Sequence, residues 1–265
     1  MLAVKTETIL VERDGGVVTV TLNRPERKNA GNGQMWRDLL LTFGEVTRRR
    51  DDRVLVLTGA GGAFCSGADI TDPKGVSGDP DDPHLIRMQF FGQTMLALHD
   101  IPKPTIAKVR GIAAGAGLSM ALGCDLIVAS DNARMSEIFS RRGLSVDGGS
   151  SWLLPRMIGL HRAKELAYFA DILSADEAAQ FGIVNRVVPD DQLDAFVYEW
   201  ACKLAAGPPL ALSMTKRLLN ESFEMSMAQA LDSEARAQTI NFYSEDTSEA
   251  MRAFTEKRDP QFRGR

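Results

Sequence analysis

Cysteine and histidine are both scarce in this sequence of 265 residues, with three of each. The cysteines, Cys65, Cys124 and Cys202, are widely spaced and odd in number, so they do not outline a disulfide framework. No histidine or cysteine falls into a spacing typical of a zinc site, such as HExxH or CxxC. The sequence therefore argues against a disulfide-bonded class and predicts no metal.

Long hydrophobic runs and an excess of positive charge are missing as well. The longest uncharged stretch covers residues 111–124, which is shorter than the roughly 18 to 20 apolar residues of a membrane-spanning helix. Five charged side chains within the first fourteen residues leave no apolar segment for a secretory signal. The formal net charge of −4, from 31 basic and 35 acidic residues, provides no positive field to attract nucleic acid. We therefore expect a cytoplasmic protein with neither a membrane nor a nucleic acid among its partners.

Hydrophobic residues make up 44% of the chain and charged residues 25%, which is typical of a folded globular protein. Residues 8–11 and 17–22 are β-branched runs separated by an Asp-Gly-Gly turn, and they predict a hairpin. Residues 54–57 form a continuous apolar run that predicts a strand buried on both faces. Ser174 and Glu177 have the spacing of a capping box, which predicts the start of a helix there.

The order of these patterns predicts the organisation of the chain. Strand and helix patterns alternate in the first part, whereas the remainder is helical in pattern. We expect an α/β core over residues 1–190 and a helical region over residues 191–265, whose apolar positions must pack on the core or on another subunit. Residues 72–83 are rich in Asp, Pro and Gly and predict a mobile surface loop that serves as a lid.

Two glycine-rich junctions follow buried strands, one over residues 61–69 and the other over residues 111–119. Small residues let a ligand approach backbone N–H groups, and the second junction opens a helix whose positive end favours a developing oxyanion. Together the two junctions could hold one carbonyl oxygen. The alternative is that these glycines only turn the chain and pack a helix against a sheet.

Several motifs, in order along nearly the whole chain, resemble those of the enoyl-CoA hydratase/isomerase, or crotonase, superfamily. A set of motifs spaced in this way is far more specific than one glycine-rich loop. The motifs that carry the resemblance are Leu22-Asn23-Arg24-Pro25 with Asn29-Ala30, Phe64-Cys65-Ser66-Gly67-Ala68-Asp69, Gly111 to Ser119 with Cys124-Asp125, Gly148-Gly149 with Leu154-Pro155-Arg156, and Phe254-Thr255-Glu256-Lys257-Arg258.

The resemblance implies an α/β fold made of a crotonase-type spiral of ββα units, followed by a helical C-terminal trimerisation region. It also implies an enzyme that binds an acyl-coenzyme A thioester and assembles as a homotrimer or as a hexamer formed by two trimers. Coenzyme A is then part of the substrate, and no further cofactor is expected.

The resemblance also assigns an oxyanion hole. It places the two backbone N–H donors on Ser66 and Ala116, with the thioester carbonyl between them. A proton next to a thioester can be removed only if the resulting enolate is stabilised, and two preorganised N–H donors provide that stabilisation. Ala116 replaces a glycine common in the family, which leaves the backbone donor in place.

The two glutamates that hold and activate water in the hydratases of this family are replaced here by Ser119 and Phe139. Addition of water by paired carboxylates is therefore not expected to be efficient. Glu137 lies two residues before the second position, and a shift of two residues along a strand would keep it on the same face. A role for Glu137 in the site is thus one possibility, and a solvent-facing glutamate is the other.

Asp147 falls where some double-bond isomerases and aromatic acyl-CoA dehalogenases of the family carry a functional aspartate. A single carboxylate can remove a proton from one carbon and return it to another, which is isomerisation without water. Ser119 could orient this carboxylate or the substrate, although Asp-Gly-Gly is also an ordinary turn. We therefore favour enoyl-CoA isomerisation slightly over hydration, with a dehalogenase or a non-catalytic acyl-CoA-binding protein as remoter alternatives.

The resemblance further suggests which residues contact coenzyme A and the acyl group. One group follows the first strands and the first glycine-rich junction, and a second lies beside the expected oxyanion hole. A third group, at the end of the chain, would reach the nucleotide of a neighbouring subunit, where Lys257 would offset phosphate charge, or would form only a solvated helix end. These groups are Arg27, Lys28, Ala30, Ser66, Gly67, Ala68 and Asp69; Gly115 and Phe139; and Phe254 and Lys257.

Overall fold

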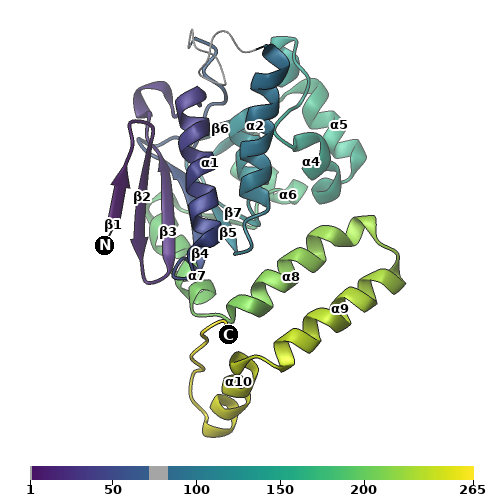
Figure 1. Cartoon of the computed structure of the whole chain (residues 1–265). Helices are drawn as coiled ribbons and strands as arrows, with labels where there is room; N and C mark the ends of the chain where they lie inside the picture. Colours follow the sequence, from purple (N-terminus) through teal and green to yellow (C-terminus); the bar gives the residue numbers. More distant parts are fainter. Residues whose placement is uncertain (1, 72–82) are drawn as a thin grey trace.

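The computed structural model describes residues 2–71 and 83–265, in which seven strands form the main sheet (Figure 1). Most of the segment expected to be a lid, residues 72–82, lies outside the described residues. The strands in sheet order are β1 (Leu2–Lys5), β2 (Ile9–Asp14), β3 (Val17–Leu22), β4 (Val54–Gly59), β5 (Thr105–Val109), β7 (Leu126–Ser130) and β10 (Arg186–Val188).

The N-terminal hairpin predicted from sequence is confirmed. Strands β2 and β3 pair antiparallel with Asp14 opposite Val17. The two turn residues, Gly15 and Gly16, have φ values of 55° and 87°, which glycine adopts without strain. From β3 to β10 all neighbouring strands are parallel. Strand β4 is buried at its first five positions, which confirms the prediction of a strand covered on both faces.

Helices cover both faces of this sheet, so the predicted α/β class is confirmed (Figure 1). The capping box of Ser174 and Glu177 opens α6, as predicted. The helices are α1 (Gly33–Arg48), α2 (His84–His99), α3 (Ala116–Leu122), α4 (Ser150–Ile158), α5 (Leu160–Phe169), α6 (Ala175–Phe181), α7 (Leu193–Ala205), α8 (Pro209–Glu221), α9 (Met227–Phe242) and α10 (Glu245–Glu256). Short 3-10 helices are η1 (Pro25–Arg27), η2 (Ile138–Arg142), η3 (Asp190–Gln192) and η4 (Ser222–Glu224).

A second, smaller sheet brings distant segments of the chain together. It consists of β6 (Ile112–Ala114), β8 (Arg134–Ser136) and β9 (Leu173–Ser174), with β6 and β8 parallel. Two isolated bridges extend this layer, because Cys65 pairs with Ala113 and Ala68 pairs with Gly31. The two glycine-rich junctions therefore lie next to each other.

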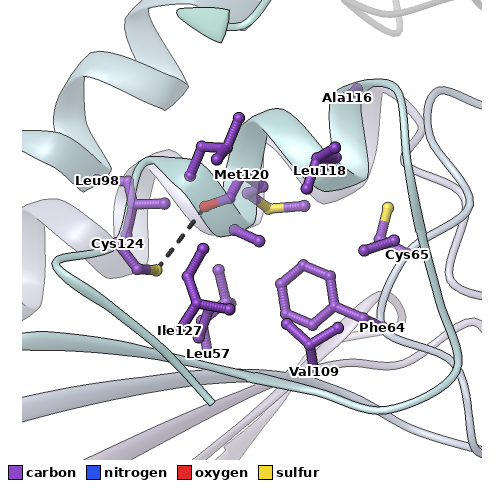
Figure 2. Packing of buried hydrophobic residues seen from close by; sticks show 14 of the residues in the cluster. Leu57, Phe64, Cys65, Leu98, Val109, Ala116, Leu118, Met120, Cys124 and Ile127 are labelled. Carbon is purple, nitrogen blue, oxygen red and sulfur yellow. Dashed lines mark hydrogen bonds between the residues drawn. The ribbon is translucent and has the colours of Figure 1, made fainter. Parts of the chain in front are cut away.

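Helix α3 is held in place by a dense apolar core (Figure 2). Its residues Leu118 and Met120 face Phe64 and side chains of β4, β5 and β7, among them Leu57, Val109 and Ile127 (Figure 2). Phe64 is completely buried, and burying a side chain of this size contributes about 1.5–3 kcal/mol. This packing fixes the start of α3 against the segment that follows Phe64.

The helical C-terminal part has two different environments. Helix α7 packs onto the sheet through Leu193, Val197 and Ala201, which meet β-strand residues such as Val54 and Ile106. This confirms that the apolar positions of this segment require a packing partner. Helices α8, α9 and α10 extend away from the sheet (Figure 1). The division of the chain at residue 190 stays a prediction.

The three cysteines are free thiols, as expected from their spacing. Burial raises the pKa of Cys65 to about 11 and that of Cys124 to about 12, so neither is a reactive thiolate at neutral pH. Within residues 2–71 and 83–265, no helix is both long and apolar enough to span a membrane. The same residues contain no cluster of three or more His, Cys, Asp or Glu side chains that could hold a metal ion.

Candidate active site

The two glycine-rich junctions meet at the start of α3. The Cys65 amide donates to Ile112 O, and the Ala114 amide donates to Cys65 O, both at 3.0 Å. Gly67 follows at φ +108°, where a Cβ would lie 3.0 Å from Ala114 O and 3.9 Å from the Ala116 nitrogen. The backbone of Gly67 thus passes directly beside the first residue of α3, and only glycine fits this position without strain.

The Ala116 amide has the properties of an oxyanion donor. Ala116 is the first residue of α3, and Gly115 before it, at φ 51° and ψ −125°, provides no side-chain cap. The Ala116 amide has no hydrogen-bond partner among the residues that the structure describes. Unpaired amides in the first turn of a helix carry the positive end of its dipole. The Ala116 amide is thus free to act as the predicted donor, and its role in an oxyanion hole stays a prediction.

The Ser66 amide, expected to be the second donor, is not available. It donates to Lys28 O at 3.0 Å, because residues 66–69 run alongside residues 28–31. In the same ladder the Gly31 amide donates to Gly67 O and the Asp69 amide to Gly31 O, both at 2.8 Å. The prediction that the Ser66 amide is an oxyanion-hole donor is therefore wrong.

The Ala68 amide fits the role better than the Ser66 amide. Neighbouring amides in an extended segment point to opposite sides. Because the Asp69 amide faces Gly31, the amide of Ala68 points away from that ladder. Ala68 is exposed, and its amide has no hydrogen-bond partner in the described part of the chain. Ala68 therefore replaces Ser66 as the candidate partner of Ala116.

The residues expected to hold coenzyme A fall into two places. Arg27 and Lys28 are exposed, Ala30 is buried, and all three lie beside the segment 66–69. The Ser66 hydroxyl donates to Arg27 O at 3.2 Å, which adds to this contact. The structure thus brings this predicted group together, and its contact with coenzyme A stays a prediction.

Asp69 has a structural partner. Its carboxylate forms an ion pair with Arg24 at 2.9 Å and accepts hydrogen bonds from Thr71. Burial alone would raise the pKa of Asp69, but the hydrogen bonds from Thr71 and Arg24 and the charge of Arg24 lower it below its ordinary value. The ionised side chain ties the end of this junction to the segment that begins at Arg24.

Phe139 lies at the expected site, whereas the two C-terminal residues do not. A Cβ on Gly115 would lie 3.7 Å from the Phe139 ring, which is buried. Phe254 is 85% exposed, and Lys257 is an exposed residue just after α10. Helix α10 lies far from β6, the strand that directly precedes α3 (Figure 1). Phe254 and Lys257 therefore do not reach the site of their own chain, and a contact with a neighbouring subunit stays a prediction.

Asp147 combines a turn with an unpaired carboxylate. Its carbonyl accepts a hydrogen bond from the Ser150 amide at 3.1 Å, and the glycines that follow have positive φ values of 59° and 91°. The sequence thus forms the expected turn. The side chain is half-buried, its Oδ1 has no hydrogen-bond partner among the described residues, and burial raises the pKa of Asp147 to about 6. The turn and the functional interpretation are therefore compatible.

The loop that carries Asp147 packs directly on α3. A Cβ on Gly148 would lie 2.7 Å from Ser119 Cβ and 3.1 Å from the Phe91 ring. Ser119 is completely buried, and its Oγ lies 3.0 Å from Asp147 O and 3.2 Å from Gly115 O. Ser119 therefore contacts the main chain of Asp147 rather than its carboxylate.

Glu137 is buried, so the alternative that it is a solvent-facing glutamate is wrong. It is 1% exposed, and its Oε1 lies 3.0 Å from the Oγ of Ser150, a residue that the sequence analysis missed. Burial raises the pKa of Glu137 to about 7, with the Ser150 hydrogen bond opposing and the Asp147 charge adding to the shift. The chain leaves β8 at Ser136, so strand alternation does not set the direction of this side chain.

A cavity of about 900 Å³ begins at Gly148 and Gly149 and continues between α2, α4 and α8. Trp152 lines it, with the His99 ring centre at 5.4 Å and the Arg156 guanidinium at 3.8 Å from its ring centre. Apolar side chains from α2 and α4 supply further walls: Met95, Leu96 and Leu153.

Known proteins resemble this chain over almost its whole length. A profile of the family described as "Enoyl-CoA hydratase/isomerase" matches residues 12–265. The 1,2-epoxyphenylacetyl-CoA isomerase of Escherichia coli (strain K12) is 38% identical over 260 residues, which cover 98% of this chain and 99% of that protein. The short-chain-enoyl-CoA hydratase of Clostridium acetobutylicum is 33% identical over 255 residues, with 94% and 95% covered. The solved enoyl-CoA hydratase of Bacillus anthracis has a TM-score of 0.91 and 30% identity, and the match covers 97% of this chain and 100% of that chain.

Proposed function

This chain belongs to the enoyl-CoA hydratase/isomerase family and has its crotonase-type fold, and from this premise we propose that it is an enoyl-CoA isomerase. The observation that carries the proposal is the half-buried Asp147 carboxylate, whose Oδ1 has no hydrogen-bond partner among the described residues and whose main-chain carbonyl contacts Ser119 of α3. The positions that correspond to the two hydratase glutamates hold Ser119 and Phe139, neither of which can act as a carboxylate base.

In the proposed reaction the thioester carbonyl lies between the amides of Ala68 and Ala116. Both amides lack other partners among the described residues, and they belong to segments that meet at Gly67. Negative charge develops on the carbonyl oxygen when the neighbouring carbon loses a proton. Donors that are fixed before the reaction stabilise this charge without reorganisation, which lowers the barrier.

Asp147 acts as the base and then as the acid. Its carboxylate removes a proton from C2 of a 3-enoyl-CoA, and the electron pair moves into a dienolate held in the oxyanion hole. The protonated Asp147 then returns the proton to C4, which leaves the double bond between C2 and C3. A base with a pKa of about 6 is ionised at neutral pH yet close enough to neutrality to donate the proton back.

We expect the two ends of the substrate to lie on different parts of the molecule. The acyl chain would occupy the cavity that begins at Gly148 and Gly149, where the walls from α2 and α4 are largely apolar. Coenzyme A would lie along residues 27–30 and 66–69, where Arg27 and Lys28 are exposed and offer positive charge to its phosphates.

Hydration of 2-enoyl-CoA is the second candidate reaction. The observation that favours it is a second buried carboxyl group close to Asp147. Ser150 contacts both residues, through its Oγ at 3.0 Å from Glu137 Oε1 and through its amide, which donates to Asp147 O at 3.1 Å. Supplying 2-enoyl-CoA and 3-enoyl-CoA separately distinguishes the two reactions. We expect migration of the double bond in 3-enoyl-CoA, with a rate that falls as the pH is lowered through about 6 because Asp147 becomes protonated. Fast addition of water to 2-enoyl-CoA without such migration would contradict the isomerase assignment.

We also propose that α8, α9 and α10 mediate assembly into a homotrimer or a dimer of trimers. These helices and the segments that join them expose many large apolar side chains, and gathered exposed apolar surface marks a site of protein–protein contact. Light scattering should therefore give three or six times the mass of one chain, and the mass of a single chain would contradict the proposal. The large exposed side chains are Leu219, Phe223, Met227, Leu231, Ile240, Phe242, Tyr243, Met251 and Phe254.

A further inference from the structure

A buried series of oxygen atoms, called the hydroxyl chain below, connects Glu137 to the backbone of the candidate active site. Glu137 Oε1 lies 3.0 Å from Ser150 Oγ, and Ser150 Oγ lies 2.9 Å from Ser119 Oγ. Ser119 Oγ in turn lies 3.0 Å from Asp147 O and 3.2 Å from Gly115 O. The chain therefore ends on the carbonyls of the proposed base and of the residue that precedes the oxyanion donor of α3.

Counting hydrogen atoms along this chain distinguishes two protonation states of Glu137. If Glu137 is ionised, the Ser150 hydroxyl donates to it and the Ser119 hydroxyl must donate to Ser150, because the two serine oxygens are in contact. The contact of Ser119 Oγ with Asp147 O at 3.0 Å then holds no hydrogen atom and brings lone pairs together, whereas the 3.2 Å contact with Gly115 O lacks a hydrogen atom in either state.

If Glu137 is protonated, every link from Glu137 to Asp147 contains one hydrogen atom. Glu137 donates to Ser150, Ser150 donates to Ser119, and Ser119 donates to Asp147 O at 3.0 Å. The environment favours the same state, because no ion pair in the described part of the chain includes Glu137, and its Oε2 is buried without a partner. Burying an unpaired carboxylate costs much more than burying a neutral acid.

We propose that Glu137 is a neutral carboxylic acid in the working enzyme and a positioning residue, which holds the Asp147 loop against α3 through Ser150 and Ser119. This inference rests on the proposed function in one respect, namely that Asp147 is the base. In this proposal the Glu137 side chain does not touch the substrate and acts on it only through these two serines. The direction of the hydroxyl chain is set by the proton on Glu137.

Ionisation of Glu137 would act on the site in two ways. It reverses the hydroxyl chain, so Asp147 O loses its hydrogen bond from Ser119, and it places a second negative charge near Asp147. Two uncharged groups face Glu137: the Ser150 hydroxyl of α4 and, beyond it, the Ser119 hydroxyl of α3. Asp147 is the charged group that raises the pKa of Glu137 further. Activity should therefore fall as the pH rises through about 7, where Glu137 loses its proton.

The test compares Glu137→Gln, Glu137→Ala and Ser150→Ala. Glutamine keeps a hydrogen-bond donor that does not titrate. Glu137→Gln should therefore retain most of the turnover that Glu137→Ala loses. Glu137→Gln should also lack the decline in activity near pH 7 that we expect for the wild type. Ser150→Ala should lower kcat on the order of 10-fold with little change in KM, the effect of one lost buried hydrogen bond. An unchanged decline in the Glu137→Gln variant, or full kcat in Ser150→Ala, would overturn the proposal.

An infrared difference spectrum tests the proton itself without substrate. The wild-type protein at neutral pH should show the carbonyl stretch of a protonated carboxylic acid, and this band should be absent from Glu137→Gln and present in Asp147→Asn. Its absence from the wild type would overturn the inference even if some variants do not fold. Failure of the proposed function can be distinguished from failure of this inference. Normal turnover in Asp147→Asn would exclude Asp147 as the base, and the infrared result for Glu137 would be unaffected.

Discussion

Turnover of 3-enoyl-CoA by the Asp147→Asn variant is expected to fall by about 100- to 10,000-fold, the range that a general acid–base group contributes. Asparagine has nearly the same size as aspartate, and the Asp147 carbonyl, which Ser150 and Ser119 contact, is unchanged. The variant should therefore fold normally and bind an acyl-CoA product with nearly unchanged affinity. The measurement is kcat for double-bond migration together with calorimetric titration of the product.

A matched control is Asp51→Asn, which makes the same chemical change at an exposed position before β4. Its kcat and its affinity for the product should both equal those of the wild type. Unchanged turnover in Asp147→Asn would remove this carboxylate from the mechanism. A loss of binding equal to the loss of turnover would instead assign Asp147 to substrate binding.

The Ala116→Pro variant is expected to lose about 100- to 1000-fold in kcat, because proline removes the backbone N–H that we assign to the oxyanion hole. Ala116 is the first residue of α3, and the first helical position is where proline is best tolerated. The conformation of Gly115, with φ 51° and ψ −125°, is one that glycine can keep before proline. The substitution thus deletes one donor while α3 keeps its hydrogen bonds.

Ala116→Gly is the corresponding control, since it keeps the N–H and restores the residue that is common at this position in the family. Its kcat should stay within a few-fold of the wild-type value. Circular dichroism and thermal unfolding of both variants separate a chemical effect from misfolding. If Ala116→Pro folds normally and isomerises 3-enoyl-CoA at the wild-type rate, the amide of Ala116 does not stabilise the enolate.

The elements that could be predicted from the sequence are those that short segments specify on their own. The hairpin follows from two β-branched runs and a turn with positive φ values, and the capping box needs only Ser174 and Glu177. Burial of β4 on both faces follows from its continuous apolar run. In each case the determining contacts lie within a few residues or within one face of one strand.

The errors arise where the direction of a group depends on a distant segment. The Ser66 amide is occupied because residues 66–69 pair with residues 28–31, a contact across more than thirty positions that no local pattern reveals. The sequence pattern allows Glu137 to be part of a strand, but β8 ends at Ser136 and η2 begins at Ile138, and the Glu137 side chain contacts Ser150 of α4. The predicted contact of Phe254 and Lys257 with a nucleotide would belong to the site of a neighbouring subunit, and it stays a prediction.

The close approach of Gly148 to Ser119 also bears on how this site could change during evolution. The family resemblance places a hydratase glutamate at position 119, but here the backbone of Gly148 lies so close that a Cβ on it would be 2.7 Å from Ser119 Cβ. A longer acidic side chain at this position would require the backbone of the neighbouring loop to move at the same time. A change of Ser119 to glutamate alone is therefore not expected to turn this site into one that adds water.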